Sequence, residues 1–234
     1  SVSGINYFYG LYASYPSQLN ITNSTFENGN YGLKYTSSST SPTVTITDCD
    51  FNGLTYGISA LSGAISISGS NFTNVTYGLS ATNMANASGI SDCNFTNNTR
   101  GIFFRALSTA PLGISYSSIS GGTDGVVAYG PLTINCDCSS VRNNSNYGFN
   151  LQEGTKLQLT STNLDGDKYP IYAYKASSIT LTNGYNTLLF GTGGKVIKGS
   201  LCISRSSLVA NYNRWNTSIP PTQPLTSSYE LLNC

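Results

Sequence analysis

A repeat of about 23 residues is the feature that most restricts how this chain can fold. Its clearest part is an isoleucine followed five positions later by a phenylalanine, as in Ile21–Phe26, Ile46–Phe51, Ile67–Phe72 and Ile90–Phe95. The second apolar position recurs every 21 to 25 residues, at Phe26, Phe51, Phe72, Phe95, Ile119, Val141 and Leu164. A small residue stands two positions before each of these, which is the period of a strand with one buried face.

Two further columns of the repeat predict a bend and a second strand. Two positions after each second apolar residue the chain has Asn or Gly, which tolerate positive φ, at Asn28, Gly53, Asn74, Asn97, Gly121, Asn143 and Gly166. A corner dipeptide such as Tyr56-Gly57 comes next, followed by an alternating apolar pair such as Ile58 and Ala60. We therefore expect a bend in the left-handed αL region and another strand with one inward face in every repeat.

Short strands joined by tight bends cannot bury a core within one repeat, so the repeats must stack. Identical slots then lie about 4.8 Å apart and form continuous apolar columns. The chain is thus predicted to be all-β, a right-handed parallel β-helix of about 8–10 coils of ~23 residues, with the hand of the usual parallel crossover. A leucine-rich repeat has a similar period, but its Leu-x-x-Leu-x-Leu pattern is absent.

This strand–bend–strand consensus, over roughly residues 5 to 190, resembles the parallel β-helix repeats of pectate-lyase-like proteins and secreted surface adhesins. The resemblance implies the fold. It leaves function open, because those families include lyases, hydrolases, tailspikes and structural stalks.

The register is harder to follow near the C-terminal end, and we expect one domain with a cap. Residues 1–194 are predicted to form the β-helix, and 195–234 the last coils, a closing cap containing Trp215 and a Pro-rich extended tail. Cys202 and Cys234 flank this tail and are a candidate disulfide. The first residues lack an initiator Met and the features of a signal peptide, so we expect a processed chain or a piece of a longer polypeptide.

The composition excludes several classes of function. Only 9% of residues are charged, against roughly 25% in an average domain, and the net charge is +1. We therefore expect no nucleic-acid partner, and no run of apolar residues is long enough for membrane insertion. Histidine is absent, which excludes His-based triads and His-ligated zinc, and we expect no metal and no cofactor.

The cysteines within the repeats are predicted from their slots. Cys49 and Cys93 share a slot two coils apart, about 10 Å, which exceeds the ~7 Å Cα limit for a disulfide, so they are predicted to be buried thiols. Cys136 is expected to point inward. Cys138 is two positions further along, so strand alternation would also place it inward. It lies nearer the bend, however, and a disulfide to a neighbouring coil remains an alternative.

Asn-x-Ser/Thr sequons begin at Asn20, Asn23, Asn71, Asn74, Asn86, Asn94, Asn97, Asn143 and Asn216. Several coincide with the predicted bends, where Asn has a backbone reason to occur. Each is therefore either a turn residue or a glycosylation candidate.

The acidic residues form no column on consecutive coils. Asp48 and Asp92 share a slot but lie two coils apart, and Asp165 and Asp167 fall in Asp-Gly-Asp-Lys, typical of a turn. A glycosidase needs two carboxylates about 5–9 Å apart, and the resemblance implies an acidic calcium cluster with an Arg or Lys for a lyase. We expect no catalytic residues.

One outward patch stands out. If the residue after each corner glycine faces inward, the next residue and the one two positions further face outward. Early repeats have mostly small hydroxyls there, such as Ser59 and Ser80. Later repeats have a candidate ligand-binding set of aromatic, amide and guanidinium side chains, at Phe103, Arg105, Tyr129, Asn150, Gln152, Tyr172 and Tyr174. This set suits stacking on sugar rings or on another protein, unless a loop or the tail covers it.

Two functions are consistent with these observations. The first is a non-enzymatic extracellular or cell-surface protein, an adhesin, stalk or filament subunit, whose partner is a second copy stacked end to end or a flanking domain of a longer chain. The alternative is a protein that binds or cleaves a polysaccharide along the outer face from Phe103 to Tyr174.

Overall fold

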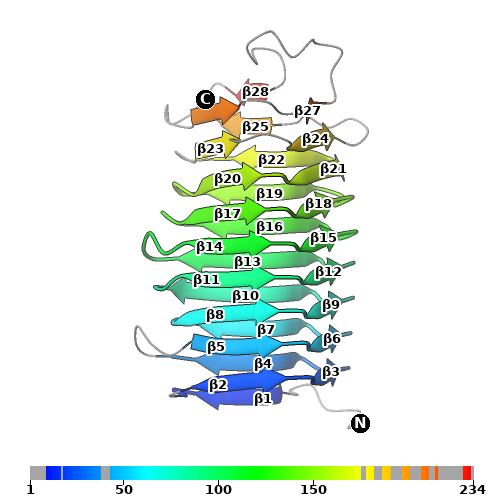
Figure 1. Cartoon of the computed structure of the whole chain (residues 1–234), viewed down its shortest axis with the longest axis vertical. Coiled ribbons are helices and arrows are strands. Elements are labelled where there is room, and N and C mark those ends of the chain that lie inside the picture. The colour runs from blue at the N-terminus through cyan, green and yellow to red at the C-terminus, as the bar shows by residue number, and fades with distance from the viewer. Residues whose placement is uncertain are drawn as a thin grey trace.

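Three parallel β-sheets run the length of the molecule, and each turn of the chain contributes one strand to each sheet (Figure 1). This computed structural model describes residues 9–16, 18–37, 43–174, 178–181 and 186–190, and further along only the backbone of the last four strands. The described residues contain strands and no helix. The architecture is the predicted parallel β-helix.

The strands of each sheet follow one another in chain order. Sheet A consists of β1 (Tyr9–Ser14), β4 (Tyr31–Thr36), β7 (Tyr56–Leu61), β10 (Tyr77–Met84), β13 (Arg100–Ala106), β16 (Asp124–Tyr129), β19 (Tyr147–Gln152), β22 (Tyr169–Ala173), β25 (Ile197–Ser200) and β28 (Tyr229–Leu232). Sheet B consists of β2 (Leu19–Thr22), β5 (Thr43–Thr47), β8 (Ala64–Ser68), β11 (Ser88–Ser91), β14 (Leu112–Ser115), β17 (Thr133–Asp137), β20 (Lys156–Thr160), β23 (Ser178–Leu181) and β26 (Ser207–Ala210). Sheet C consists of β3 (Thr25–Glu27), β6 (Asp50–Asn52), β9 (Asn71–Thr73), β12 (Asn94–Thr96), β15 (Ser118–Ser120), β18 (Ser140–Arg142), β21 (Asn163–Asp167), β24 (Thr187–Phe190) and β27 (Arg214–Trp215).

The number of coils follows from this order. Strands β1 to β21 make seven consecutive coils of three strands each. Backbone pairing then carries the three sheets on through β28. The predicted Trp-containing cap, the Pro-rich tail and the candidate pair Cys202 and Cys234 lie outside the residues whose side chains are described.

The register pairs equivalent slots of the repeat. In sheet C the paired residues are Phe26, Phe51, Phe72, Phe95, Ile119, Val141 and Leu164, as the alignment predicts. In sheet B the same holds for Ile21, Ile46, Ile67, Ile90, Ile114, Cys136 and Leu159. One-residue slips would turn the apolar set outward, so burial of one face of each strand holds this register.

The core consists of these columns. The rings of Phe51 and Phe72 stack with centroids 4.7 Å apart, and those of Phe72 and Phe95 with centroids 4.5 Å apart. All three side chains are at most 1% exposed. Each ring thus covers the next along the helix axis, so the core is continuous from coil to coil.

Two columns of αL residues separate the sheets. The predicted column between sheets C and A is confirmed, because all of its members have φ between 55° and 75°, at Asn28, Gly53, Asn74, Asn97, Gly121, Asn143 and Gly166. A second column lies between sheets B and C and was not predicted, at Asn23, Asp48, Gly69, Asp92, Tyr116, Cys138 and Ser161. The segment from the isoleucine to the phenylalanine of each repeat, such as Ile21–Phe26, therefore includes the end of one strand, a bend and the start of the next strand.

The cysteine predictions are confirmed at three positions and wrong at one. Cys49, Cys93 and Cys136 are free, buried thiols. Cys138 is also free, but it is exposed rather than inward-facing. It lies in the second bend column with φ 46°, and the bend interrupts the strand alternation from which its inward parity was inferred.

Candidate functional site

The predicted patch is assembled on the outer face of sheet A. Neighbouring strands pair Phe103 with Val127 and Arg105 with Tyr129, and one coil further they pair Val127 with Asn150 and Tyr129 with Gln152. Strand β22 adds Tyr172 beside Asn150, and Tyr174 follows at its end. The seven candidate residues therefore lie side by side on four adjacent strands, and we call them the outer patch.

The aromatic residues at the N-terminal end of the outer patch cover each other in part. The ring centroids of Phe103 and Tyr129 are 5.7 Å apart, with an interplanar angle of 48°. Val127 pairs with Phe103 in the outward column and is only 2% exposed. Arg105 is exposed and forms no ion pair with the described residues. This end offers apolar ring surface beside the exposed guanidinium of Arg105.

The C-terminal end of the outer patch combines amides and tyrosines. Gln152 Nε2 donates to Asn150 Oδ1 at 2.9 Å. The rings of Tyr172 and Tyr174 are nearly parallel, at an interplanar angle of 9° with centroids 6.4 Å apart. The Tyr172 ring also contacts that of Tyr147, at 5.0 Å between centroids.

A second outward column was missed in the sequence. The residue before the corner glycine is tyrosine in the first coils and is half-buried in most coils, whereas Tyr9 is exposed and Asp124 is buried. Tyr31, Tyr56 and Tyr77 form a ladder with centroids 4.8 and 4.9 Å apart and planes within 8°. Because the rings stack on each other, the ladder offers mainly ring edges and hydroxyls to a ligand. The Tyr-Gly dipeptides were the signal for this column.

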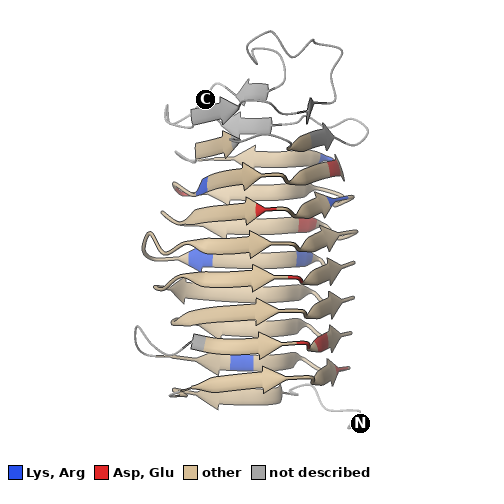
Figure 2. Ribbon diagram, in the orientation of Figure 1, with Lys and Arg blue, Asp and Glu red and all other residues tan. Residues whose placement is uncertain are grey.

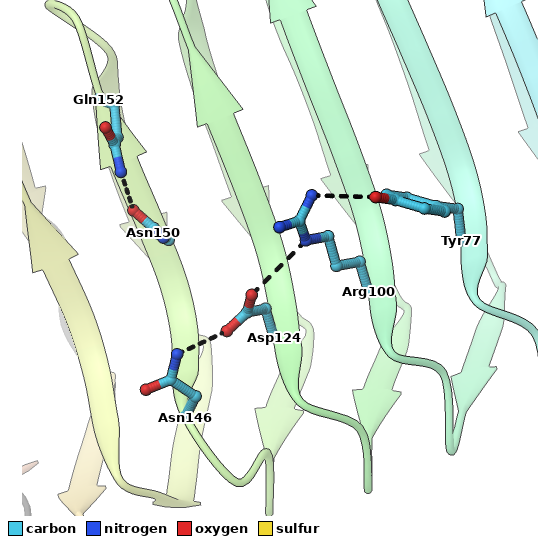
Figure 3. A network of polar contacts seen from close by, with 6 residues as sticks. All are labelled: Tyr77, Arg100, Asp124, Asn146, Asn150 and Gln152. Atoms are coloured by element: carbon cyan, nitrogen blue, oxygen red, sulfur yellow. Dashed lines mark hydrogen bonds and ion pairs between the residues drawn. The ribbon is translucent and has the colours of Figure 1, made fainter.

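Arg100 and Asp124 replace tyrosine in two coils and form a polar network (Figure 3). Arg100 Nη1 donates to the Tyr77 hydroxyl at 3.2 Å, and its Nε lies 3.7 Å from Asp124 Oδ2. Asn146 Nδ2 donates to Asp124 Oδ1 at 3.1 Å. The Arg100 guanidinium also lies over the rings of Tyr77 and Phe103, at 5.4 and 5.7 Å from their centroids. The network therefore joins the tyrosine ladder to the outer patch.

Asp124 is the acid of this network. It is 8% exposed, and burial raises the pKa of its carboxyl above the usual value, while hydrogen bonding from Asn146 and the charge of Arg100 act in the opposite direction. Its oxygens are occupied by Arg100 and Asn146, so Asp124 serves to fix these side chains.

The first two coils also differ from the predicted row of small hydroxyls. The Lys34 ammonium lies 5.1 to 5.9 Å from the ring centroids of Tyr9, Tyr12 and Tyr31. Tyr12 is 52% exposed and Tyr9 39%. The repeat pattern did not predict the tyrosines around Lys34.

The other acids of the described part of the chain are scattered along the stack, as Figure 2 shows. Asp48 and Asp92 are exposed bend residues two coils apart, and Asp50 accepts a hydrogen bond from Asn71. The described residues include no group of three or more Cys, Asp or Glu that could hold a metal ion. They also include no helix that could span a membrane.

The prediction of Asp165 and Asp167 as ordinary turn residues is wrong for Asp167. Both lie in β21, on either side of the bend residue Gly166. Asp167 is fully buried, as are Leu54, Val75, Asn98 and Asn144, the residues that follow the same bend in other coils. Asp165 is half-buried.

The described sequon asparagines fall into two groups. Asn23, Asn74, Asn97 and Asn143 are exposed bend residues with positive φ, whereas Asn20, Asn71 and Asn94 are exposed strand residues and Asn86 is half-buried. The Nδ2 atoms of Asn71 and Asn94 donate to Asp50 and Asn71 respectively, at 2.8 and 3.0 Å. Asn216 lies outside the described residues.

Comparison with known proteins gives one match. A family model described as "Right handed beta helix region" matches residues 4–64 and 37–186, which together are well over half of the chain. This match agrees with the predicted hand of the β-helix. No characterised protein and no solved structure matches the chain.

Proposed function

The chain belongs to the right-handed β-helix family, and from this premise we propose that it is a non-enzymatic structural protein of the cell exterior. In this proposal it is a stalk, surface protein or filament subunit that joins further β-helix coils through the ends of its sheets.

The N-terminal end of the stack carries this proposal. Among the described strands, β1, β2 and β3 each pair on one side only. The core slots of this first coil are incompletely covered, because Leu11 and Phe26 are only partly buried whereas Leu33 and Phe51, one coil further, are 0% and 1% exposed. A further coil placed there would extend three sheets and bury these side chains.

The extracellular placement is part of the proposal. It is supported by a surface in which charged residues are few and by exposed sequon asparagines such as Asn20 and Asn74. The partner is either a second copy, which makes an open fibre, or a further stretch of the same polypeptide.

Negative-stain electron microscopy at increasing protein concentration tests end-to-end assembly. We expect fibres or end-to-end rods, which a Leu19→Lys variant abolishes because it places a charge in a core slot of the open end. Asn20→Lys is the matched control on the adjacent outward position and should leave the fibres intact. Circular dichroism checks that Leu19→Lys is folded. Single short rods at every concentration would contradict assembly between copies.

The outer patch favours a second candidate function, the binding of a polysaccharide. Partly exposed aromatic rings, two amides and the exposed Arg105 lie on one sheet, and this combination suits a sugar ring with its apolar faces and hydroxyl edge. Cleavage would be an extension of this second candidate.

Affinity electrophoresis in gels containing a neutral glucan or an acidic polyuronate tests the outer patch. We expect Tyr129→Ala and Tyr174→Ala to abolish any retardation, whereas Tyr116→Ala, at an exposed bend between the other two sheets, should not. Unchanged retardation in the patch variants would remove this candidate. An enzyme would also lose polysaccharide cleavage in Arg105→Ala while keeping its fold.

A further inference from the structure

Asp167 occupies a slot that asparagines fill in other coils. Asn98, Asn144 and Asp167 each follow directly after an αL residue of the bend between sheets C and A. All three side chains are at most 2% exposed. Their Oδ1 atoms accept a hydrogen bond from the backbone N–H of the same slot one coil earlier, at Val75 (3.0 Å), Gly122 (3.2 Å) and Asn144 (2.7 Å). These residues form an internal ladder along the helix axis.

The second side-chain atom distinguishes Asp167 from Asn98. Asn98 Nδ2 donates at 3.0 Å to the carbonyl of Phe72, the residue paired with Phe95 in the preceding coil. The equivalent acceptor for Asp167 is the carbonyl of Val141, which pairs with Leu164 in the same way. However, Asp167 Oδ2 is buried and, as a bare carboxylate oxygen, has no hydrogen-bond partner among the described residues. A buried polar atom without a partner destabilises the folded state, so a hydrogen-bond donor at this position would be favoured.

We propose that Asp167 is held as a neutral carboxylic acid whose Oδ2–H donates to the Val141 carbonyl, and that its loss of this proton loosens the coil formed by β19 to β21. In this arrangement Oδ1 accepts from Asn144 N and Asn144 Nδ2, at 2.7 and 2.9 Å, and the protonated Oδ2 completes the ladder. Asp167 is then a pH-sensitive latch within the β-helix.

The surroundings of Asp167 favour the neutral form. Burial raises the pKa of its carboxyl to about 7, and the charge of Asp165 acts in the same direction, against the lowering by the Asn144 hydrogen bonds. The adjoining elements present these titratable groups: Asp165 on β21, Arg142 on β18, Lys168 between β21 and β22, Tyr147 on β19 and Tyr169 on β22. Arg142 and Lys168 are exposed, and neither forms an ion pair with Asp167. Strand β24 has no titratable residue.

The direction of the pH effect follows from the raised pKa. An aspartate in the unfolded chain has a pKa of about 3.9. The folded chain therefore binds the proton more tightly, and its stability is greatest below about pH 4 and is lost as the pH rises towards 7. Since each pKa unit is a factor of ten, this group lowers the equilibrium constant for folding by up to about a thousand-fold across that window.

Urea denaturation of the full chain between pH 4 and 8.5, compared with Asp167→Asn, tests the latch. The amide supplies a permanent donor, so we expect the variant to lack the loss of stability between pH 4 and 7 and to unfold at a higher urea concentration than the wild type at pH 8. Asp165→Asn is the control on the same strand and should retain most of the pH dependence. Parallel pH profiles for wild type and Asp167→Asn would overturn the proposal.

A direct measurement covers the case in which Asp167→Asn does not fold. The ¹³C chemical shift of the Asp167 carboxyl in the wild-type chain, assigned by NMR, should titrate near neutral pH. A midpoint below pH 5 would show that Asp167 is ionised in the folded state and would likewise overturn the latch.

Discussion

At the scale of single residues, the surroundings of each thiol decide how reactive it is. Burial raises the pKa of the Cys93 thiol to about 11 and that of Cys136 to about 12, and it also raises the pKa of Cys49. Cys93 Sγ lies 3.1 Å from the carbonyl of Ser91, within the column of small residues that the repeat predicts. Cys138, in the exposed bend, is the one described thiol that reagents can reach. The reactive species is the thiolate, so burial suppresses reaction both by exclusion and by protonation.

Thiol labelling at pH 8 checks this assignment. In a Cys202→Ser/Cys234→Ser variant we expect one thiol to react with a disulfide reagent in the folded protein, and the remaining three only after denaturation. Adding Cys138→Ser should remove the fast reaction entirely. A second fast-reacting thiol would show that a core column is more open than described.

At the scale of elements, the corner glycines allow adjacent coils to approach closely. A Cβ on Gly78 would lie 2.5 Å from the Gly101 carbonyl oxygen and 2.6 Å from Phe95 Cδ1. Gly32 and Gly57 meet the next glycine carbonyl and a phenylalanine ring in the same way. The corner position therefore has glycine because the backbone of the next coil and a core phenylalanine ring leave no room for a Cβ. The residue before the glycine lies on the outer face.

Paired glycine substitutions test this packing. Gly78→Ala should lower the free energy of unfolding by about 1–3 kcal/mol or more, since backbone of the next coil must shift to admit the methyl group. Gly89→Ala, on β11, meets no atom within 4 Å and should be neutral or raise it by up to about 1 kcal/mol. The measurement is urea denaturation at pH 5. Equal effects of the two variants would contradict the close approach.

At the scale of the whole molecule, the stack is held by burial and by backbone pairing rather than by charge. Only 9% of the residues are charged. The Arg100–Asp124 pair is the one ion pair among the described residues, and the Arg100 side chain is 36% exposed. Because the Arg100 side chain is partly exposed, salt screens this single pair in part, and its contribution is small beside that of the whole stack.

The stability of the β-helix should accordingly depend little on ionic strength. Raising NaCl from 0.05 to 0.5 M at pH 5 is expected to change the free energy of unfolding by less than about 1 kcal/mol. Thermal unfolding followed by circular dichroism provides the measurement, with Arg100→Gln as a variant in which even this small response should shrink. A large loss of stability in salt would reveal ion pairs beyond the described residues.

The sequence by itself determined the β-helix, its register and the seven residues of the outer patch. It could do so because every coil repeats the same slots, so that a residue's neighbours are those about 23 positions away. Asn and Gly marked the bend between sheets C and A because that bend requires positive φ at one position.

Only the tertiary structure decided three further features. The bend between sheets B and C is occupied even by Tyr116 and Cys138, so residue type does not reveal this bend. The bend also interrupts the strand alternation from which inward and outward faces were inferred. The network of Arg100 and Asp124 depends on side chains one coil away. The burial of Asp167 depends on the bend turning the following residue into the core, where a local pattern of Asp, Gly and Lys predicts an exposed turn. A local pattern predicts φ and strand period, but the environment of a side chain depends on the coils above and below it.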